Sequence, residues 1–211
     1  KVLLGPERKS KMMSEKEKKI TAYHESGHAV VAHALPDADP VQKVSIISRG
    51  RTGGFTLKTP TEDKSYRTLK EFQADLAVML AGQIAERQVF NEVSTGASND
   101  LRAATQLARQ IVTRYGMSKL GPRTFGDQEE LIFLGREIHE RRDYSEKAAQ
   151  DIDQEINHLL TTAQLMAEKI LTKQRAALDR IAQELLVKET IERDAFEALL
   201  GPKPKAAPLA A

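Results

Sequence analysis

Two histidines four residues apart, with a glutamate directly after the first, are the residues of this chain best suited to chemistry. The segment His24-Glu25-Ser26-Gly27-His28 matches the H-E-x-x-H pattern. On a helix, residues at i and i+4 project from one face, so both imidazoles would point in the same direction. Two neutral imidazoles bind zinc well, and Glu25, about 100° around the helix, would reach a water beside the metal. Because zinc lowers the pKa of that water toward about 7, Glu25 is expected to act as general base in peptide hydrolysis.

A catalytic zinc site also needs a third protein ligand and one open position. His33 follows His28 by five residues, which places it about 140° around the helix, so it is expected to point elsewhere. The longer H-E-x-x-H-x-x-G-x-x-H pattern fails, because Val31 and Ala34 occupy its glycine and third histidine positions. The third ligand is therefore expected to be a carboxylate from a later element, and the candidates are Glu71, Asp75, Glu86, Glu92 and Asp100. Spacing alone favours Glu86 and Asp100 equally.

The elements that must position these residues are predicted to be mostly helices around one short sheet, an α+β fold that is predominantly helical. Ser14 followed by Glu17 is a capping box, and apolar residues continue to Pro36, so one helix is expected from about 14 to 35. The β-branched residues of 41–48 predict a strand, and the Gly-rich turn after it leads to a second strand at 55–59. The histidine pair is then well inside a helix that precedes a β-hairpin.

The rest of the chain is predicted to be helical. A helix is expected over 66–90, and its apolar side consists of Leu69, Phe72, Leu76, Met79, Leu80 and Ile84. Another is expected over 98–115, closed by Gly116 in a left-handed conformation, with Asp100 in its first turn. The segments 144–173 and 175–187 predict a long and a shorter helix, and the tail after Gly201 is expected to be disordered.

The amino-acid composition restricts the classes of protein to which the chain can belong. With 211 residues, 40% of them hydrophobic and 29% charged, the chain is expected to be a soluble globular protein with its own core. No run approaches the roughly 18 apolar residues of a membrane span. The absence of cysteine excludes disulfides and thiolate metal sites. A net charge of +2 and 5% aromatic residues argue against nucleic acid as a partner.

A wider pattern is formed by the stretches TAYHESGHAVVAHALPDADPVQKVSII, the hairpin RGRTGGFT, AGQIAE, STGASNDLRAATQLARQIVTRYGMS and, in the C-terminal helices, DIDQEI. Together these stretches resemble the peptidase domain of FtsH, the membrane-anchored AAA+ zinc protease family (peptidase family M41). The resemblance implies His24 and His28 as zinc ligands, Asp100 as the third ligand, and Glu25 as the general base. It also implies that Glu86 orients a histidine, the support that metal ligands usually have.

The resemblance carries further expectations about the whole protein. The strand Gly53–Gly54–Phe55–Thr56 is expected to pair with extended, unfolded polypeptide substrates by backbone hydrogen bonds. One Zn²⁺ per chain is implied, whereas ATP would bind only to a missing upstream module. Residues 1–13 would be the linker from it, 14–143 the metallopeptidase core, 144–201 a helical segment of the same domain, and 202–211 the tail. The full protein would be a homo-hexamer on the cytoplasmic face of the bacterial inner membrane, attached only by missing N-terminal segments, and would degrade misfolded proteins.

Two positions depart from the family pattern. Arg87 stands where the family commonly has a second acid, and Thr52-Gly53 stands where its hairpin often has Ala-Leu. The first change would alter the charge near Glu86, and the second would loosen the strand beside the zinc. Two other functions remain open: a zinc-stabilised module for hexamer assembly that does not cut, and an unrelated H-E-x-x-H peptidase with Glu86 as ligand. Retention of Glu25 argues against the first, because a structural zinc site needs no adjacent base.

Overall fold

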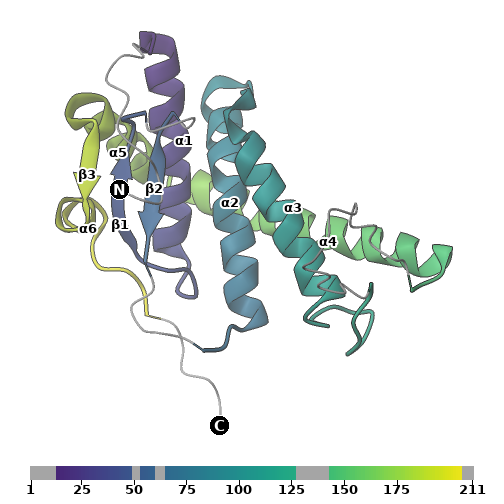
Figure 1. The fold of residues 1–211 in the computed structure, drawn as a ribbon. Coiled ribbons are helices and arrows are strands. Elements are labelled where there is room, and N and C mark those ends of the chain that lie inside the picture. Colours follow the sequence, from purple (N-terminus) through teal and green to yellow (C-terminus); the bar gives the residue numbers. More distant parts are fainter. Residues whose placement is uncertain (1–12, 49–52, 60–64, 127–142, 206–211) are drawn as a thin grey trace, which may run out of the picture.

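Helices dominate the fold, and one small sheet lies against them. The computed structural model describes residues 13–48, 53–59, 65–126 and 143–205. In chain order its elements are α1 (Glu15–Ala34), β1 (Val41–Ser45), β2 (Phe55–Lys58), α2 (Leu69–Phe90), the 3₁₀ turn η1 (Thr95–Ala97), α3 (Ser98–Thr113), α4 (Glu146–Lys173), α5 (Arg175–Lys188), β3 (Thr190–Glu192) and α6 (Arg193–Leu200). The predicted α+β, mostly helical class is confirmed. Figure 1 shows the sheet on one side of α1 and α2 on the other.

Helix α1 is the centre of the molecule. It begins with the predicted capping box, in which the Glu17 backbone N–H donates to the Ser14 hydroxyl at 3.2 Å and the Ser14 N–H donates to the Glu17 carboxylate at 2.9 Å. It ends at Ala34, two residues before Pro36, which disfavours helical geometry in the residue before it. Every residue from 22 to 33 is buried, because α2, α5 and the sheet enclose the helix. The H-E-x-x-H segment therefore lies inside the protein.

Helices α1 and α2 approach each other closely at Gly27. A Cβ atom on this residue would lie 2.6 Å from the Ala81 carbonyl oxygen and 2.7 Å from the Ala85 Cβ, closer than real Cβ contacts allow. Only glycine fits between the two backbones. On the predicted apolar side of α2, Leu76 and Ile84 are buried.

The sheet has the strand order β2-β1-β3, and both pairs are antiparallel. Its β1–β2 pair confirms the two strands of the predicted hairpin, with an irregularity between Val41 and Lys43. The turn residues 49–52 lie outside the described residues. Within the described strands β2 is at an edge. The third strand, β3, was not predicted, because three residues are too few to show an alternating pattern. The short helix α6 after it was not predicted either.

Several predicted boundaries shift because caps end or begin the elements. The helix expected from 66 begins at Leu69, capped by Thr68, and the one expected from 144 begins at Glu146, capped by Ser145. The helix expected to reach 115 ends at Thr113, and Gly116 has the predicted left-handed conformation, with φ of 61°. The first strand ends at Ser45 rather than 48. Most of the predicted linker and part of the predicted tail, 1–12 and 206–211, lie outside the described residues. Among the described helices, none combines the length and apolar character needed to cross a membrane.

Candidate active site

The two histidines of α1 are held in place by acceptors on α2. The Nδ1 atom of His24 lies 2.6 Å from Oε1 of Glu86, and the Nδ1 atom of His28 lies 2.6 Å from the backbone carbonyl oxygen of Val78. A carbonyl or carboxylate oxygen only accepts, so each Nδ1 carries the proton and donates it. In the neutral form of each ring, the Nε2 atom then presents a lone pair.

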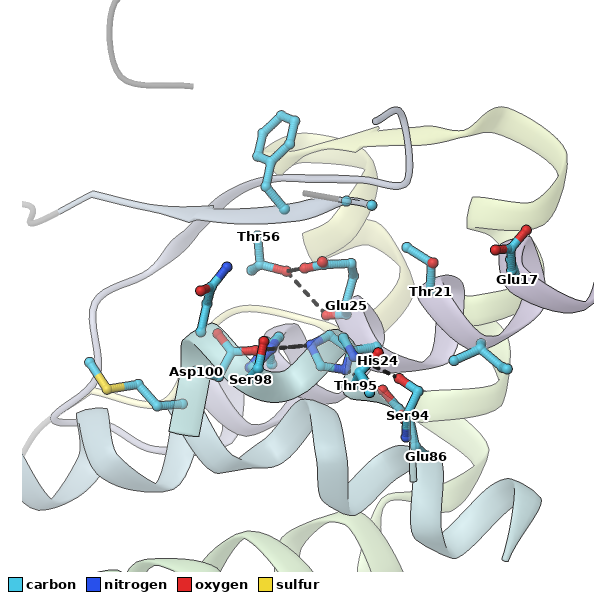
Figure 2. Close-up of a pocket in the computed structure, with 18 of the residues that line it drawn as sticks. Glu17, Thr21, His24, Glu25, Thr56, Glu86, Ser94, Thr95, Ser98 and Asp100 are labelled. Carbon is cyan, nitrogen blue, oxygen red and sulfur yellow. Dashed lines mark hydrogen bonds and ion pairs between the residues drawn. The ribbon is translucent and has the colours of Figure 1, made fainter. Parts of the chain in front are cut away.

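These two Nε2 atoms meet the carboxylate of Asp100. The two Nε2 atoms are 3.0 Å apart. The Oδ2 atom of Asp100 lies 3.1 Å from Nε2 of His24 and 3.6 Å from Nε2 of His28. Asp100 reaches them from the first turn of α3, as predicted for that residue. Figure 2 shows His24 between Asp100 on one side and Glu86 on the other, with dashed lines to both neighbours of its ring.

The three atoms fit a zinc ion. Two imidazole lone pairs and a carboxylate oxygen converge without a donor among them in the neutral tautomers, which leaves them unsatisfied unless a cation binds. Their spacings of 3.0 to 3.6 Å are close to the about 3.3 Å expected between ligands of a tetrahedral ion with bonds of 2.0–2.1 Å. Nitrogen and carboxylate donors of this kind are common in catalytic zinc sites.

The charges around the site also favour a cation. Burial would lower the pKa of His24, but its hydrogen bonds with Asp100 and Glu86 outweigh this and raise the pKa to about 10. Burial would raise the pKa values of Asp100 and Glu86, and the contacts with the histidines instead lower both. A proton on His24 and a metal ion therefore compete for the same nitrogen.

Glu25 lies beside this cluster but is held by the sheet. Its Oε2 atom accepts a hydrogen bond of 2.8 Å from the Thr56 hydroxyl of β2. Burial raises the pKa of Glu25, and the two histidines oppose that shift. Figure 2 shows Thr56 next to Glu25, joined to it by dashed lines. A buried carboxylate beside these imidazoles has a position that a general base would need.

The other candidate acids do not join the convergence of His24, His28 and Asp100 in the described structure. Glu86 contacts the Nδ1 atom of His24, whereas Asp100 contacts its Nε2 atom. Glu71 belongs to the capping box of α2, Asp75 pairs with Lys58 and Arg67, and Glu92 is exposed. Outside this set, His33 is buried with its ring 5.5 Å from that of Phe196 on α6, away from the site as expected.

A cavity of about 670 Å³ opens over the cluster. Its lining includes all four residues of the predicted substrate strand, Gly53, Gly54, Phe55 and Thr56, together with His24, Glu25, His28 and Asp100. On the opposite side it is lined by Val78 and Met79 of α2 and by Ser94 to Gly96. The cavity has room for an extended peptide segment beside β2.

Sequence reasoning missed two residues that shape the site. A Cβ on Gly82 would lie 2.6 Å from Nε2 of both His24 and His28, so α2 needs a glycine where the imidazoles face it. The backbone N–H of Ser94 donates to Oε2 of Glu86 at 2.6 Å and fixes that carboxylate. The only sequence signal for Gly82 was the presence of a glycine inside a predicted helix, where glycine lowers helix stability by about 1 kcal/mol relative to alanine.

Arg87, which departs from the family pattern, points away from the site. Its guanidinium pairs with the Glu168 carboxylate on α4, and the neighbouring Gln88 bonds to the Glu168 carbonyl oxygen at 3.2 Å. The Arg87 side chain therefore joins α2 to α4.

Comparisons with known proteins identify the family of the chain. The chain matches the model of "Peptidase family M41" over residues 11–199. It is 54% identical to "ATP-dependent zinc metalloprotease FtsH 1" of Sphaerobacter thermophilus over 206 residues and 53% identical to the protein of the same name from Thermomicrobium roseum; each alignment covers 97% of this chain and 32% of the relative. "ATP-dependent zinc metalloprotease FtsH 2" of Alkaliphilus metalliredigens is 52% identical over 94% of this chain and 29% of its own length.

The chain thus spans about a third of the length of these relatives. The family match covers most of its residues and includes α1, α2 and α3, the three helices that carry the histidines and the carboxylates around them. The chain belongs to peptidase family M41.

Proposed function

We propose that this chain is the proteolytic part of a zinc-dependent endopeptidase. The observation that carries the proposal is the convergence of His24, His28 and Asp100, with Glu25 buried beside them and a cavity above. His24, His28 and Asp100 would hold the zinc ion, which supplies a Lewis acid that polarises the peptide carbonyl and acidifies a water molecule. The names of the relatives, which are zinc metalloproteases, support the same assignment.

The residues of the chain have distinct tasks in this proposal. Glu86 and the Val78 carbonyl hold the imidazoles by their Nδ1 atoms, so that both Nε2 atoms face the cavity. Glu25 accepts the proton of the attacking water at its carboxylate and passes it to the leaving amine nitrogen.

The edge strand β2 would bind the substrate. Its outer edge is not paired within the described sheet, and it borders the cavity at Gly53, Gly54, Phe55 and Thr56. An extended peptide would add there by backbone hydrogen bonds. Backbone pairing selects for extension rather than for side chains, so the substrates would be unfolded polypeptides of varied sequence.

The whole protein would be an ATP-dependent, membrane-anchored homo-hexamer that degrades misfolded soluble and membrane proteins at the cytoplasmic face of the bacterial inner membrane. Support for ATP dependence comes from the names of the relatives, whose additional length leaves room for such a module. Symmetric closure of a ring would enclose the active sites. We further propose that 144–201 forms one domain with 14–143, because α4 packs on α2 and α5 packs on α1.

The alternative, a zinc-stabilised assembly module without activity, is less well supported. Structural zinc sites are normally closed by four protein ligands. In the described part of the chain, three ligating groups converge, and the open side faces the cavity next to Glu25. A glutamate-ligand site is also disfavoured, because Glu86 faces the nitrogen of His24 that points away from Asp100.

The first test compares cleavage of an unstructured protein by the zinc-loaded chain and by its Glu25→Gln variant, without nucleotide. We expect cleavage by the parent, and its loss in the variant although zinc remains bound. Equal cleavage by both would refute Glu25 as the base, and zinc binding without cleavage by either would support the assembly module. Asp100→Ala should release zinc, and undiminished zinc binding would refute Asp100 as a ligand.

A further inference from the structure

Strand β2 contacts the helices on its inner side through alternate residues. Successive side chains of a strand point to opposite faces. Accordingly Thr56 donates to Glu25 on α1, and Lys58 donates to Asp75 on α2 at 2.9 Å, whereas Leu57 between them is 42% exposed. The strand is thus fastened to both helices of the site by two polar contacts.

The approach of β2 to Glu25 is very close. A Cβ atom on Gly54 would lie 3.0 Å from Cγ of Glu25, 2.9 Å from Cγ2 of Thr21 and 2.8 Å from the Ser45 carbonyl oxygen. A larger residue at this position would push the strand away from α1. The glycine therefore allows the Thr56 hydroxyl to reach the carboxylate.

We propose that Thr56 is a positioning residue that fixes the carboxylate of Glu25 by donating a hydrogen bond to its Oε2 atom. This inference rests on the proposed function, in which Glu25 is the base and β2 the strand that binds substrate. Strand β2 would then have two roles: its backbone pairs with the substrate, and the Thr56 side chain orients the base.

The chemistry of both residues supports this. A glutamate side chain has three rotatable bonds, so holding it in one orientation costs conformational entropy. Threonine is β-branched and stiff at χ1, so the direction of its hydroxyl follows the β2 backbone. The hydroxyl also lies 3.2 Å from the Glu25 carbonyl oxygen, but its single proton is directed to the nearer, charged acceptor at 2.8 Å. Among the described residues, Oε1 of Glu25 receives no hydrogen bond and is left to take a proton.

The kinetic test uses two substitutions at one position. Thr56→Val has nearly the same shape without the hydroxyl, and Thr56→Ser keeps the hydroxyl. With an unstructured protein as substrate, we expect kcat to fall about 10- to 100-fold in the valine variant, the range of a hydrogen bond to a charged group, with KM and zinc content unchanged. Serine should restore most of kcat. Thr113→Val, which removes an exposed hydroxyl bonded to Arg109 on α3, is the control and should behave as the parent.

A second test does not depend on cleavage. The ¹³C carboxyl resonance of Glu25, assigned by its disappearance in Glu25→Gln, is measured in the 211-residue chain and in both Thr56 variants without zinc. We expect it to shift in Thr56→Val and to stay in place in Thr56→Ser. If the parent does not cleave but this shift occurs, the proposed function fails and the contact stands. A valine variant with the parent's kcat or the parent's resonance would overturn the inference.

Discussion

Replacing Gly82 by alanine tests whether the imidazoles of His24 and His28 are as tightly confined as the structure indicates. The new Cβ would lie 2.6 Å from Nε2 of both rings, whereas ordinary contacts begin at 3.4 Å. The rings would have to move by about 0.8 Å, or α2 would have to move away from α1 by a comparable distance. Neither ring turns freely, because each is bonded through its Nδ1 atom at 2.6 Å.

This displacement can be converted into an effect on zinc. Zinc–ligand distances in working sites vary by only about 0.2 Å, so a shift of about 0.8 Å disrupts the set of ligands. We expect Gly82→Ala to lower zinc affinity by at least 100-fold, more than the loss of a residue that merely supports a ligand. Stability should change little, because alanine gains about 1 kcal/mol of helix propensity and overpacking costs about 1–3 kcal/mol.

The assay is a competition titration with a chromogenic chelator, accompanied by circular dichroism to check that the helices are intact. Gly27→Ala is a contrasting variant, because its Cβ would meet the backbone oxygen of Ala81, which cannot move without α2. It should destabilise the fold rather than act on zinc alone. A folded Gly82→Ala variant with zinc affinity within threefold of the parent would refute the reasoning.

Two other predictions concern carboxylates on α2. Glu86→Gln should weaken zinc binding about 10- to 100-fold in the same titration, because His24 loses a charged partner, and unchanged affinity would contradict that role. Burial would raise the pKa of Asp75, but Lys58 and Arg67 lower it. The ionised Asp75 carboxylate therefore stabilises the folded state above the unfolded pKa of about 3.9, and this contribution is lost as pH falls through the folded pKa. Asp75→Asn should therefore reduce the free energy of unfolding in urea by about 2 kcal/mol at pH 7 and by less in acid; a difference independent of pH would refute this.

Local signals were sufficient to predict the helix that carries the histidines. The capping box of Ser14 and the i, i+4 spacing of His24 and His28 involve only neighbouring residues, and the structure contains both as expected. The choice between Glu86 and Asp100 did not follow from spacing and rested on the family resemblance, because it depends on which nitrogen of one imidazole each carboxylate faces. Spacing along the chain does not encode that rotation.

Other features were beyond sequence reasoning for the same physical reason. The Val78 carbonyl that orients His28 is a backbone group, which every residue has. The role of Gly82 follows from what lies opposite it on another helix. Strand β3 exists because it pairs with β1 across more than 140 residues, and its three residues carry no pattern of their own.

The strand order has a consequence for the synthesis of the protein. Helix α1 precedes in the chain the elements that support it: it is enclosed by α5, and β1 is paired on the side away from β2 by β3, which ends at Glu192. A nascent chain would therefore carry the H-E-x-x-H segment without the completed sheet that supports β2. Under the proposed function, the site would be complete only once nearly all of this domain has been made.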